Sequence, residues 1–407
     1  MELVGILEMS MLLPKYSDIE HYVTLEPQTS YIFRFIIQNI SNIQQSNGKH
    51  ILSNDTEEAE YLVQSLVDKY WERIHTGHFS QVSQDIRKIY AVGNYFKIFY
   101  LLFRNSEVEQ LAKCNEILDQ AILLGCTQNL YVNNVRLQNC LQKYFSAVLY
   151  ADLRLPIIKS LQRQLLRCDI PQYDCPSIDF FRKNCFETKC PALLLNSISH
   201  WSALEKWRDL NYIIKIAGNR TVPVEIGSNY TSEEWSQQLI KIRDFLQRQF
   251  CGNIKDSEFE IEYLAQHELF DQVPELMKDI RIPDYCILAT KAEQKVDIKA
   301  WLGPKGTISP LHYDPKHNLL CQVFGAKTVI LAAPEDSSNL YPHKTQFLNN
   351  TSQIDAINLD LQKYPKSANV KFLQLTIQEG DCLYIPKKWW HYVRAETESF
   401  SVSFWWE

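Results

Sequence analysis

The sequence has no cluster of lysine and arginine and no apolar run long enough to span a bilayer. Its 407 residues carry 42 basic and 48 acidic side chains, a formal net charge of −6. A nucleic-acid surface needs a basic patch, so direct binding to DNA or RNA is not expected. The most apolar stretch, residues 89–103, is shorter than the roughly 20 residues that a membrane-spanning helix needs. We therefore expect no membrane segment and interpret this stretch as a buried helix.

A basic N-terminal leader and paired CxxC motifs are also missing. The chain begins MELVGILEMSMLLPK, with an acidic residue at position 2, so a secretory signal is not expected. The 11 cysteines are an odd number, and the group at 168, 175, 185 and 190 lacks the CxxC spacing of a zinc site. We expect reduced cysteines, buried as small hydrophobic residues of an intracellular protein.

The first 170 residues show helical periodicity. Apolar residues recur at spacings of three and four within 55–74, 106–125 and 137–148. Asp55 and Glu58 resemble a capping box that starts the first of these segments, and Gly125 is a stop signal after the second. Short polar breaks separate the segments, so we expect an antiparallel array of helices. The pattern fits a module that binds a protein partner as well as it fits a scaffold or a dimer surface.

A domain boundary is expected near residue 170, where DIPQYDCP carries two prolines and no periodicity. Beyond it come short segments rich in β-branched and aromatic residues, namely TVPVEIG, KAWLG, NLLCQVFG, KTVILAAP, LQLTIQEGDCLYIP and SFSVSFWW. Such segments predict a β-sandwich or barrel, interrupted here by helices near 232–250 and 353–363. The expected class is α+β, with a helical domain over 1–170 and a β-barrel domain with decorating helices over 171–407.

Two motifs in the C-terminal half carry the chemistry. In HYD, at 312–314, His312 and Asp314 are two residues apart, so on a strand both side chains project from one face. In GDCLYIPKKWWH, a turn at Gly380 leads into a strand that Pro386 ends, and His391 opens the next strand. Two imidazoles and one carboxylate can hold a divalent metal and leave the opposite positions open. This set favours Fe(II) and oxygen chemistry.

From about residue 177 onward, the sequence resembles the JmjC oxygenase domain. FDQVPELMKDIRIPDYC, GTISPLHYDP, LYPH, NTSQID and HYVRAETESFSVSFWW are most similar to the JmjC arginyl hydroxylases. The resemblance implies a double-stranded β-helix of jelly-roll or cupin type, with Fe(II) held by His312, Asp314 and His391. It also implies 2-oxoglutarate as the cosubstrate, converted to succinate and carbon dioxide. Such hydroxylases have a helical N-terminal half too, although residues 1–170 carry no comparably specific motif.

The same resemblance implies a cosubstrate site. Residues that match Tyr263, Ser309, Asn318, Lys327 and Trp405 hold 2-oxoglutarate in such enzymes, and all five are present. Hydroxyl, amide and indole groups can donate hydrogen bonds to carboxylate oxygens. A lysine inside a barrel is costly without a partner, and the remote carboxylate of the cosubstrate supplies one for Lys327. Without the family, this lysine is more simply a solvated strand end.

Three further residues, Glu225, Trp235 and Trp301, match the substrate pocket of the arginyl hydroxylases. A carboxylate can bind a guanidinium through two parallel hydrogen bonds, and an aromatic ring can stack on it. The leading hypothesis is therefore hydroxylation of arginyl side chains, at C3 by resemblance. The partners would be proteins or peptides with an accessible arginine, histone tails among them. Without the family, the same residues are a solvated glutamate and two core tryptophans.

Other functions stay open at this point. Demethylation of methyl-lysine in histones would use the same metal and cosubstrate, with an aromatic cage in place of the carboxylate. Cleavage of histone tails at methylated arginine is another activity attached to the family, but no hydrolytic constellation is evident beyond the metal. A non-enzymatic binding module would not need all three metal ligands, His312, Asp314 and His391. The resemblance implies residence in the nucleus, with the cytoplasm as a second location, although no strong basic import signal is present.

Overall fold

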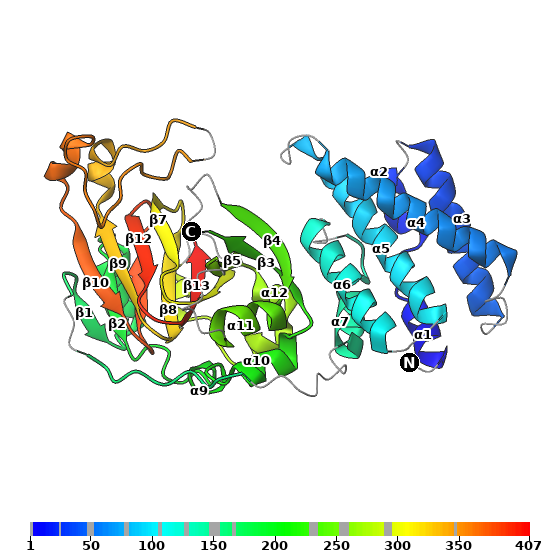
Figure 1. Ribbon diagram of the computed structural model, residues 1–407, viewed down its shortest axis with the longest axis horizontal. Coiled ribbons are helices and arrows are strands. Elements are labelled where there is room, and N and C mark those ends of the chain that lie inside the picture. The colour runs from blue at the N-terminus through cyan, green and yellow to red at the C-terminus, as the bar shows by residue number, and fades with distance from the viewer. Residues whose placement is uncertain are drawn as a thin grey trace. The chain divides into compact units, whose positions relative to one another are not determined.

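The computed structural model describes residues 3–23, 26–46, 53–76, 81–104, 108–125, 130–145, 155–164, 168–227, 235–251, 260–288, 295–345 and 348–407. Contacts divide the chain into two compact units. The first comprises Met1–Ala151 with Asn219–Thr221, and the second comprises Asp152–Gly218 with Val222–Glu407. Figure 1 labels most of the helices and strands of both.

The first unit consists of helices that pack on their neighbours in the chain (Figure 1). They are α1 (Leu3–Ser10), α2 (Tyr16–Val23), α3 (Pro27–Gln45), α4 (Asn54–His75), α5 (Gln84–Arg104), α6 (Val108–Leu124) and α7 (Asn134–Phe145). Helix α5 contacts both α4 and α6, and nearly all of its residues from Ile89 to Phe103 are buried. The buried helix predicted for 89–103 is thus confirmed. None of the described helices is both long and apolar enough to cross a membrane.

The start of α4 differs from the predicted capping box. The N-cap is Ser53, whose hydroxyl accepts a hydrogen bond from the backbone N–H of Thr56 at 3.3 Å. Asp55 instead lies in the first turn, where its negative charge is favourable near the positive end of the helix dipole. The predicted stop at Gly125 is confirmed, because α6 ends at Leu124.

The second unit is a double-stranded β-helix of the cupin type. Its larger sheet has the order β1-β2-β11-β8-β13-β6-β5-β3-β4, and its smaller sheet has the order β10-β9-β12-β7. The strands are β1 (Gln172–Asp174), β2 (Ala192–Leu195), β3 (Thr221–Ile226), β4 (Ser236–Lys241), β5 (Glu262–His267), β6 (Asp297–Gly303), β7 (Ile308–Tyr313), β8 (His317–Phe324), β9 (Lys327–Ala332), β10 (Leu373–Ile377), β11 (Cys382–Ile385), β12 (Trp390–Ala395) and β13 (Ser399–Trp406). The expected α+β class with a jelly-roll C-terminal half is confirmed.

Short helices decorate this unit, as expected. They are α8 (Ile178–Phe181), α9 (Ala203–Lys206), α10 (Leu210–Ala217), α11 (Ile242–Cys251), α12 (Leu269–Gln272) and α13 (Pro274–Met277). There are also a π-helical turn η2 (Arg182–Phe186) and 3-10 turns η3 (Asp284–Ile287), η4 (Pro334–Asn339) and η5 (Pro365–Asn369). The two sheets face each other across an apolar core, in which Leu320 and Leu383 of the larger sheet pack with Val329, Leu331 and Val393 of the smaller. Every residue of β8 and β9 is buried, so polar residues on these strands are well isolated from water.

The units divide after Ala151, earlier than the boundary predicted near residue 170. The described residues between these two positions bind the second unit. Arg163 donates a hydrogen bond to the Asp381 carboxylate at 2.8 Å. The Asp169 N–H donates to Gln374 O at 3.1 Å, and the Asp169 carboxylate accepts from the Gln374 N–H at 3.0 Å. The prolines and the loss of periodicity near residue 170 indicate a segment without regular secondary structure. They do not reveal which of the two units this segment binds.

One of the two helices predicted in this unit is wrong, and the other is partly right. Residues 353–363 form turns and bends, because the carboxylates of Asp355 and Asp360 accept hydrogen bonds from backbone N–H groups just downstream. Such local bonds compete with a helix. In the range 232–250, residues 232–234 lie outside the described residues, Ser236–Lys241 forms the edge strand β4, and α11 begins at Ile242. Pairing with β3 outweighs the helical pattern there.

Candidate metal centre

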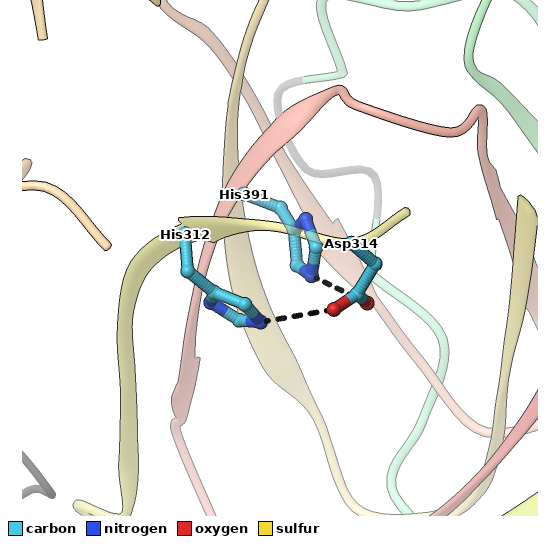
Figure 2. Close-up of side chains that lie close together, drawn as sticks. All are labelled: His312, Asp314 and His391. Carbon is cyan, nitrogen blue, oxygen red and sulfur yellow. Dashed lines mark ion pairs between the residues drawn. The ribbon is translucent and has the colours of Figure 1, made fainter. Parts of the chain in front are cut away.

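Two adjacent strands bring the three predicted metal ligands together. His312 on β7 and His391 on β12 are direct partners in an antiparallel pair, and their ring centres lie 4.2 Å apart. Asp314 follows β7, and its backbone carbonyl accepts from the N–H of Lys388 at 2.8 Å. Figure 2 shows both imidazoles turned toward the Asp314 carboxylate. One ligand atom of each residue lies within 4.8 Å of the others, a separation that one divalent ion can bridge.

Hydrogen bonds to the main chain fix both imidazoles. His312 Nδ1 lies 2.7 Å from Pro310 O, and His391 Nδ1 lies 3.1 Å from Trp389 O. A carbonyl oxygen can only accept, so Nδ1 carries a proton in each ring, and in the neutral ring Nε2 is the nitrogen with the free lone pair. The two Nε2 atoms lie 3.9 and 3.6 Å from the oxygens of Asp314. This is the tautomer that a metal ligand needs.

Burial also keeps His391 uncharged. Its side chain is buried, which lowers its pKa to about 4, and His312 acts in the same direction. Asp314 Oδ2 is buried and accepts no hydrogen bond from any described residue. Such an oxygen is costly without a donor or a cation. Two imidazoles and one carboxylate fit Fe(II) well, so the residues present are suited to a metal of this kind.

A cavity lies beside the three ligands. Its lining comes from both sheets and consists of Tyr263, Trp301, Ser309, His312, Asp314, Asn318, Leu320, Lys327, His391, Val393, Ser403 and Trp405. All five residues predicted to hold the cosubstrate belong to it. Ser403 was not predicted, although alternation along SFSVSFWW places it on the same face of β13 as Trp405. Its hydroxyl accepts from the Trp301 indole at 3.0 Å.

Lys327 is a buried cation in this cavity. The residue is 1% exposed, and its Nζ donates to the hydroxyl of Tyr263 at 3.2 Å. No carboxylate among the described residues forms an ion pair with it. Burial therefore lowers the pKa of Lys327 to about 7. An isolated buried charge is expensive, and the carboxylate of a bound ligand would offset that cost.

A tight turn positions Lys327. Gly325 has a φ of +78°, and a Cβ at this position would lie 2.0 Å from Glu398 O, so only glycine fits. The turn joins β8 to β9 and lets Asn318 and Lys327 face the same cavity. Asn318 is also the direct partner of Trp405 across β8 and β13. Asn318 Oδ1 and Trp405 Nε1 are both buried and make no hydrogen bond to a described residue. A polar ligand in the cavity would satisfy them.

Glu225 lies beside the cavity, although it is not part of the lining. It is the direct partner of Tyr263 in the antiparallel pair of β3 and β5, so the two side chains share one face. Burial raises the pKa of Glu225, and the indole of Trp235 acts in the opposite direction. Trp235 is likewise outside the lining. Trp301 does line the cavity, with its ring centre 6.1 Å from that of Tyr263.

Comparison with known proteins agrees with this architecture. Residues 177–407, more than half of the chain, match the family of cupin-like domains. The chain is 55% identical over 402 residues to Jumonji C domain-containing protein 5 of Drosophila melanogaster, covering 98% of this chain and 99% of that protein. It is 38% identical over 357 residues to lysine-specific demethylase 8 of Danio rerio, covering 84% and 86%. Lysine-specific demethylase JMJ30 of Arabidopsis thaliana is 44% identical over 257 residues, covering 63% and 59%.

Proposed function

The chain belongs to the cupin-like JmjC oxygenase family, and from this premise we propose that it hydroxylates arginyl side chains of proteins, using Fe(II) and 2-oxoglutarate. When bound, these two would supply, with dioxygen as the oxidant, the chemistry that places one oxygen atom in a substrate C–H bond to give C–OH and the other in succinate, with release of carbon dioxide. The observation that carries the substrate class is the half-buried Glu225, which is the strand partner of Tyr263 beside the cavity.

The residues of the cavity support the cosubstrate. The ammonium of Lys327 would pair with the remote carboxylate of 2-oxoglutarate, which would then be stabilised as an ion pair away from water. Tyr263, Ser309 and Trp405 each offer an O–H or N–H group to carboxylate oxygens, and Asn318 offers its amide. His312, Asp314 and His391 would hold the metal on one side and leave the cavity side open.

Glu225 supports arginine as the substrate residue. Burial disfavours its ionised form, and a guanidinium would restore that form through two parallel N–H···O bonds. Trp301 presents an aromatic ring on which a planar guanidinium can stack. We further propose that the substrates are proteins with an accessible arginine, histone tails among them, and that the protein acts in the nucleus.

Methyl-lysine demethylation is the second candidate, because the zebrafish and Arabidopsis relatives are named lysine-specific demethylases. It would use the same metal and cosubstrate. A dimethyl- or trimethylammonium group cannot donate two parallel hydrogen bonds, and it favours a cage of aromatic rings over a carboxylate. The half-buried carboxylate of Glu225 therefore supports arginine over methyl-lysine.

Mass spectrometry on matched peptides tests the proposal. Peptides with arginine, or with dimethyl-lysine at the same place, are incubated with the protein, Fe(II), ascorbate and 2-oxoglutarate. We expect one added oxygen on arginine, none of it with His312→Ala. Glu225→Gln should still convert 2-oxoglutarate to succinate but hydroxylate arginine at least tenfold more slowly, because the neutral amide cannot pair with a guanidinium. Loss of methyl groups from lysine with arginine unchanged would contradict the proposal and favour the demethylase.

A further inference from the structure

Strand β7 carries His312 although it is the edge strand of the smaller sheet. An open edge leaves N–H and C=O groups unpaired. Residues 350–352 close this edge. The Ser352 N–H donates to Leu311 O at 2.8 Å, and Thr351 forms an antiparallel bridge with His312. β7 is therefore paired on both sides at the level of the metal ligand, with β12 on one side and residues 350–352 on the other.

The segment that closes the edge is half of a hairpin. The His343 N–H donates to Thr351 O at 2.9 Å, and the Gln353 N–H donates to Tyr341 O at 3.0 Å. Thr351 and Ser352 are both buried, so the pairing is shielded from water. The two halves of this hairpin contain the motifs LYPH and NTSQID. Neither motif contributes a side chain to the metal ligands or to the cavity lining, so their place in the fold needs another explanation.

Asn350 binds one residue of β7 twice. Its backbone carbonyl accepts from the Tyr313 N–H at 3.0 Å, and its Nδ2 donates to Tyr313 O at 3.0 Å. Tyr313 separates the two metal ligands of HYD, and its carbonyl belongs to the peptide plane that leads into Asp314. Because a peptide is planar, holding this oxygen fixes the direction in which the chain enters Asp314. Lys388 N–H holds the following carbonyl, that of Asp314 itself.

We propose that Asn350 is a positioning residue for the metal centre. It acts through Tyr313, because its amide orients the Tyr313–Asp314 peptide and thereby the Asp314 carboxylate. The hairpin of 341–345 and 348–353 is the support that keeps Asn350 in place. The inference rests on the metal centre of the proposed function, but not on the identity of the substrate.

Cobalt binding tests this role without any turnover. The full chain, stripped of metal, is titrated with Co(II), and the visible absorption bands report both the affinity and the ligand geometry. Asn350→Ala should weaken Co(II) binding about tenfold, since groups that orient a metal ligand typically contribute that much. Asn350→Asp, similar in shape, places an acceptor against the Tyr313 carbonyl and should weaken binding at least as much. The matched control is Gln353→Ala, which removes an exposed hydrogen bond to Pro342 O within the same hairpin.

The outcomes separate the two claims. Circular dichroism and thermal unfolding first establish that the variants are folded. A folded Asn350→Ala or Asn350→Asp that binds Co(II) with the affinity and spectrum of the unmodified chain would overturn the positioning role. An equal loss in Gln353→Ala would also overturn it, because the effect would then belong to the hairpin as a whole. If the unmodified chain binds no Co(II), the metal centre fails, and this inference fails with it.

Discussion

Glu26 of the helical unit and Lys327 of the cupin unit are charged residues in opposite situations. Glu26 is surrounded by donors: Arg73 is in contact with it, Tyr70 OH lies at 2.7 Å and Lys69 Nζ at 2.9 Å. Burial alone would raise its pKa, but these hydrogen bonds together lower it to about 2. Among the described residues, Lys327 Nζ forms its hydrogen bond with the neutral Tyr263, and burial lowers the pKa of Lys327 to about 7. The surroundings stabilise the charge of the first residue and destabilise that of the second.

The difference separates a structural charge from a functional one. The Glu26 cluster is complete without any other molecule. In the cupin unit, the unpaired cation of Lys327 lines the same cavity as Asp314, Asn318 and Trp405, each of which has a buried polar atom without a partner among the described residues. Buried polar groups are costly when unpaired, so their convergence on one cavity indicates a ligand.

The largest effect is expected for Lys327→Met, which should change ligand binding and stability in opposite directions. Affinity for 2-oxoglutarate should fall by roughly 3–5 kcal/mol, as when one partner of a buried ion pair is removed. The ligand-free protein should become more stable by about 1–4 kcal/mol, because an unpaired buried charge is replaced by an apolar side chain. Calorimetric titration measures the affinity for 2-oxoglutarate, and thermal unfolding measures the stability of the ligand-free protein. Lys316→Met, which removes a partly exposed ion pair with Asp297, is the control. Unchanged 2-oxoglutarate affinity in Lys327→Met would contradict the assignment.

A smaller effect is expected where the two units divide. Asp381 is fully buried, and burial raises its pKa while Gln378 and Arg163 act against this. Removing the Arg163 side chain, itself half exposed, should lower the free energy of unfolding by roughly 1–2 kcal/mol. Urea denaturation of Arg163→Ala measures the loss, with the exposed Lys159→Ala of the same segment as control. If both variants match the unmodified chain, the ion pair of Arg163 with Asp381 contributes no stability to the second unit.

The pH dependence of cosubstrate binding should report the charge of Lys327 directly. Lys327 must be protonated to pair with a carboxylate, and with a pKa of about 7 it loses its proton as pH rises. Affinity for 2-oxoglutarate should therefore be constant below pH 7 and fall about tenfold for each pH unit above it. Lys327→Met should bind weakly at every pH with no such slope. A flat profile in the unmodified chain between pH 7 and 9 would show that Lys327 stays charged without its ligand.

The smallest effect is expected for Glu26→Gln. The carboxylate and both basic partners are partly exposed, so the loss of stability at pH 7 should be about 1 kcal/mol or less. Since its folded pKa lies below the usual 4.5, the stabilisation is complete above pH 4.5 and is lost as pH falls toward 2. The unfolding midpoints of the two proteins in urea should converge between these pH values. Cosubstrate affinity should not change, and any change would contradict the separation of the two charges.

Alternation along single strands made part of the site predictable from sequence. The spacing of His312 and Asp314, and the turn and proline before His391, are local patterns, and the strands form where they indicate. Lys327 could be assigned only through the family, because a lysine at the start of a strand is usually solvated. Asn350 was not predicted, since nothing in NTSQID reveals that it pairs with a strand well upstream.

Two predictions were wrong because side chains bind the nearby backbone in ways that spacing does not show. They are the capping box and the helix over 353–363. Asp355 and Asp360 show how side chains that bind their own backbone remove a helix that the apolar pattern favours. Near the predicted boundary, Arg163 and Asp169 bind Asp381 and Gln374, which lie far downstream. Long-range pairing decides which unit such a segment joins, and a single sequence does not show which segments pair.

The direct pairing of His312 with His391 has a consequence for how the protein matures. Side chains alternate along a strand, so a slip of one residue would turn His391 away and present Trp390 or Tyr392 beside His312. The same slip would carry the apolar side chains of β12 to the opposite face, so the core and the paired imidazoles depend on one register. A bound metal would stabilise that register further, because only there do the two imidazoles lie together.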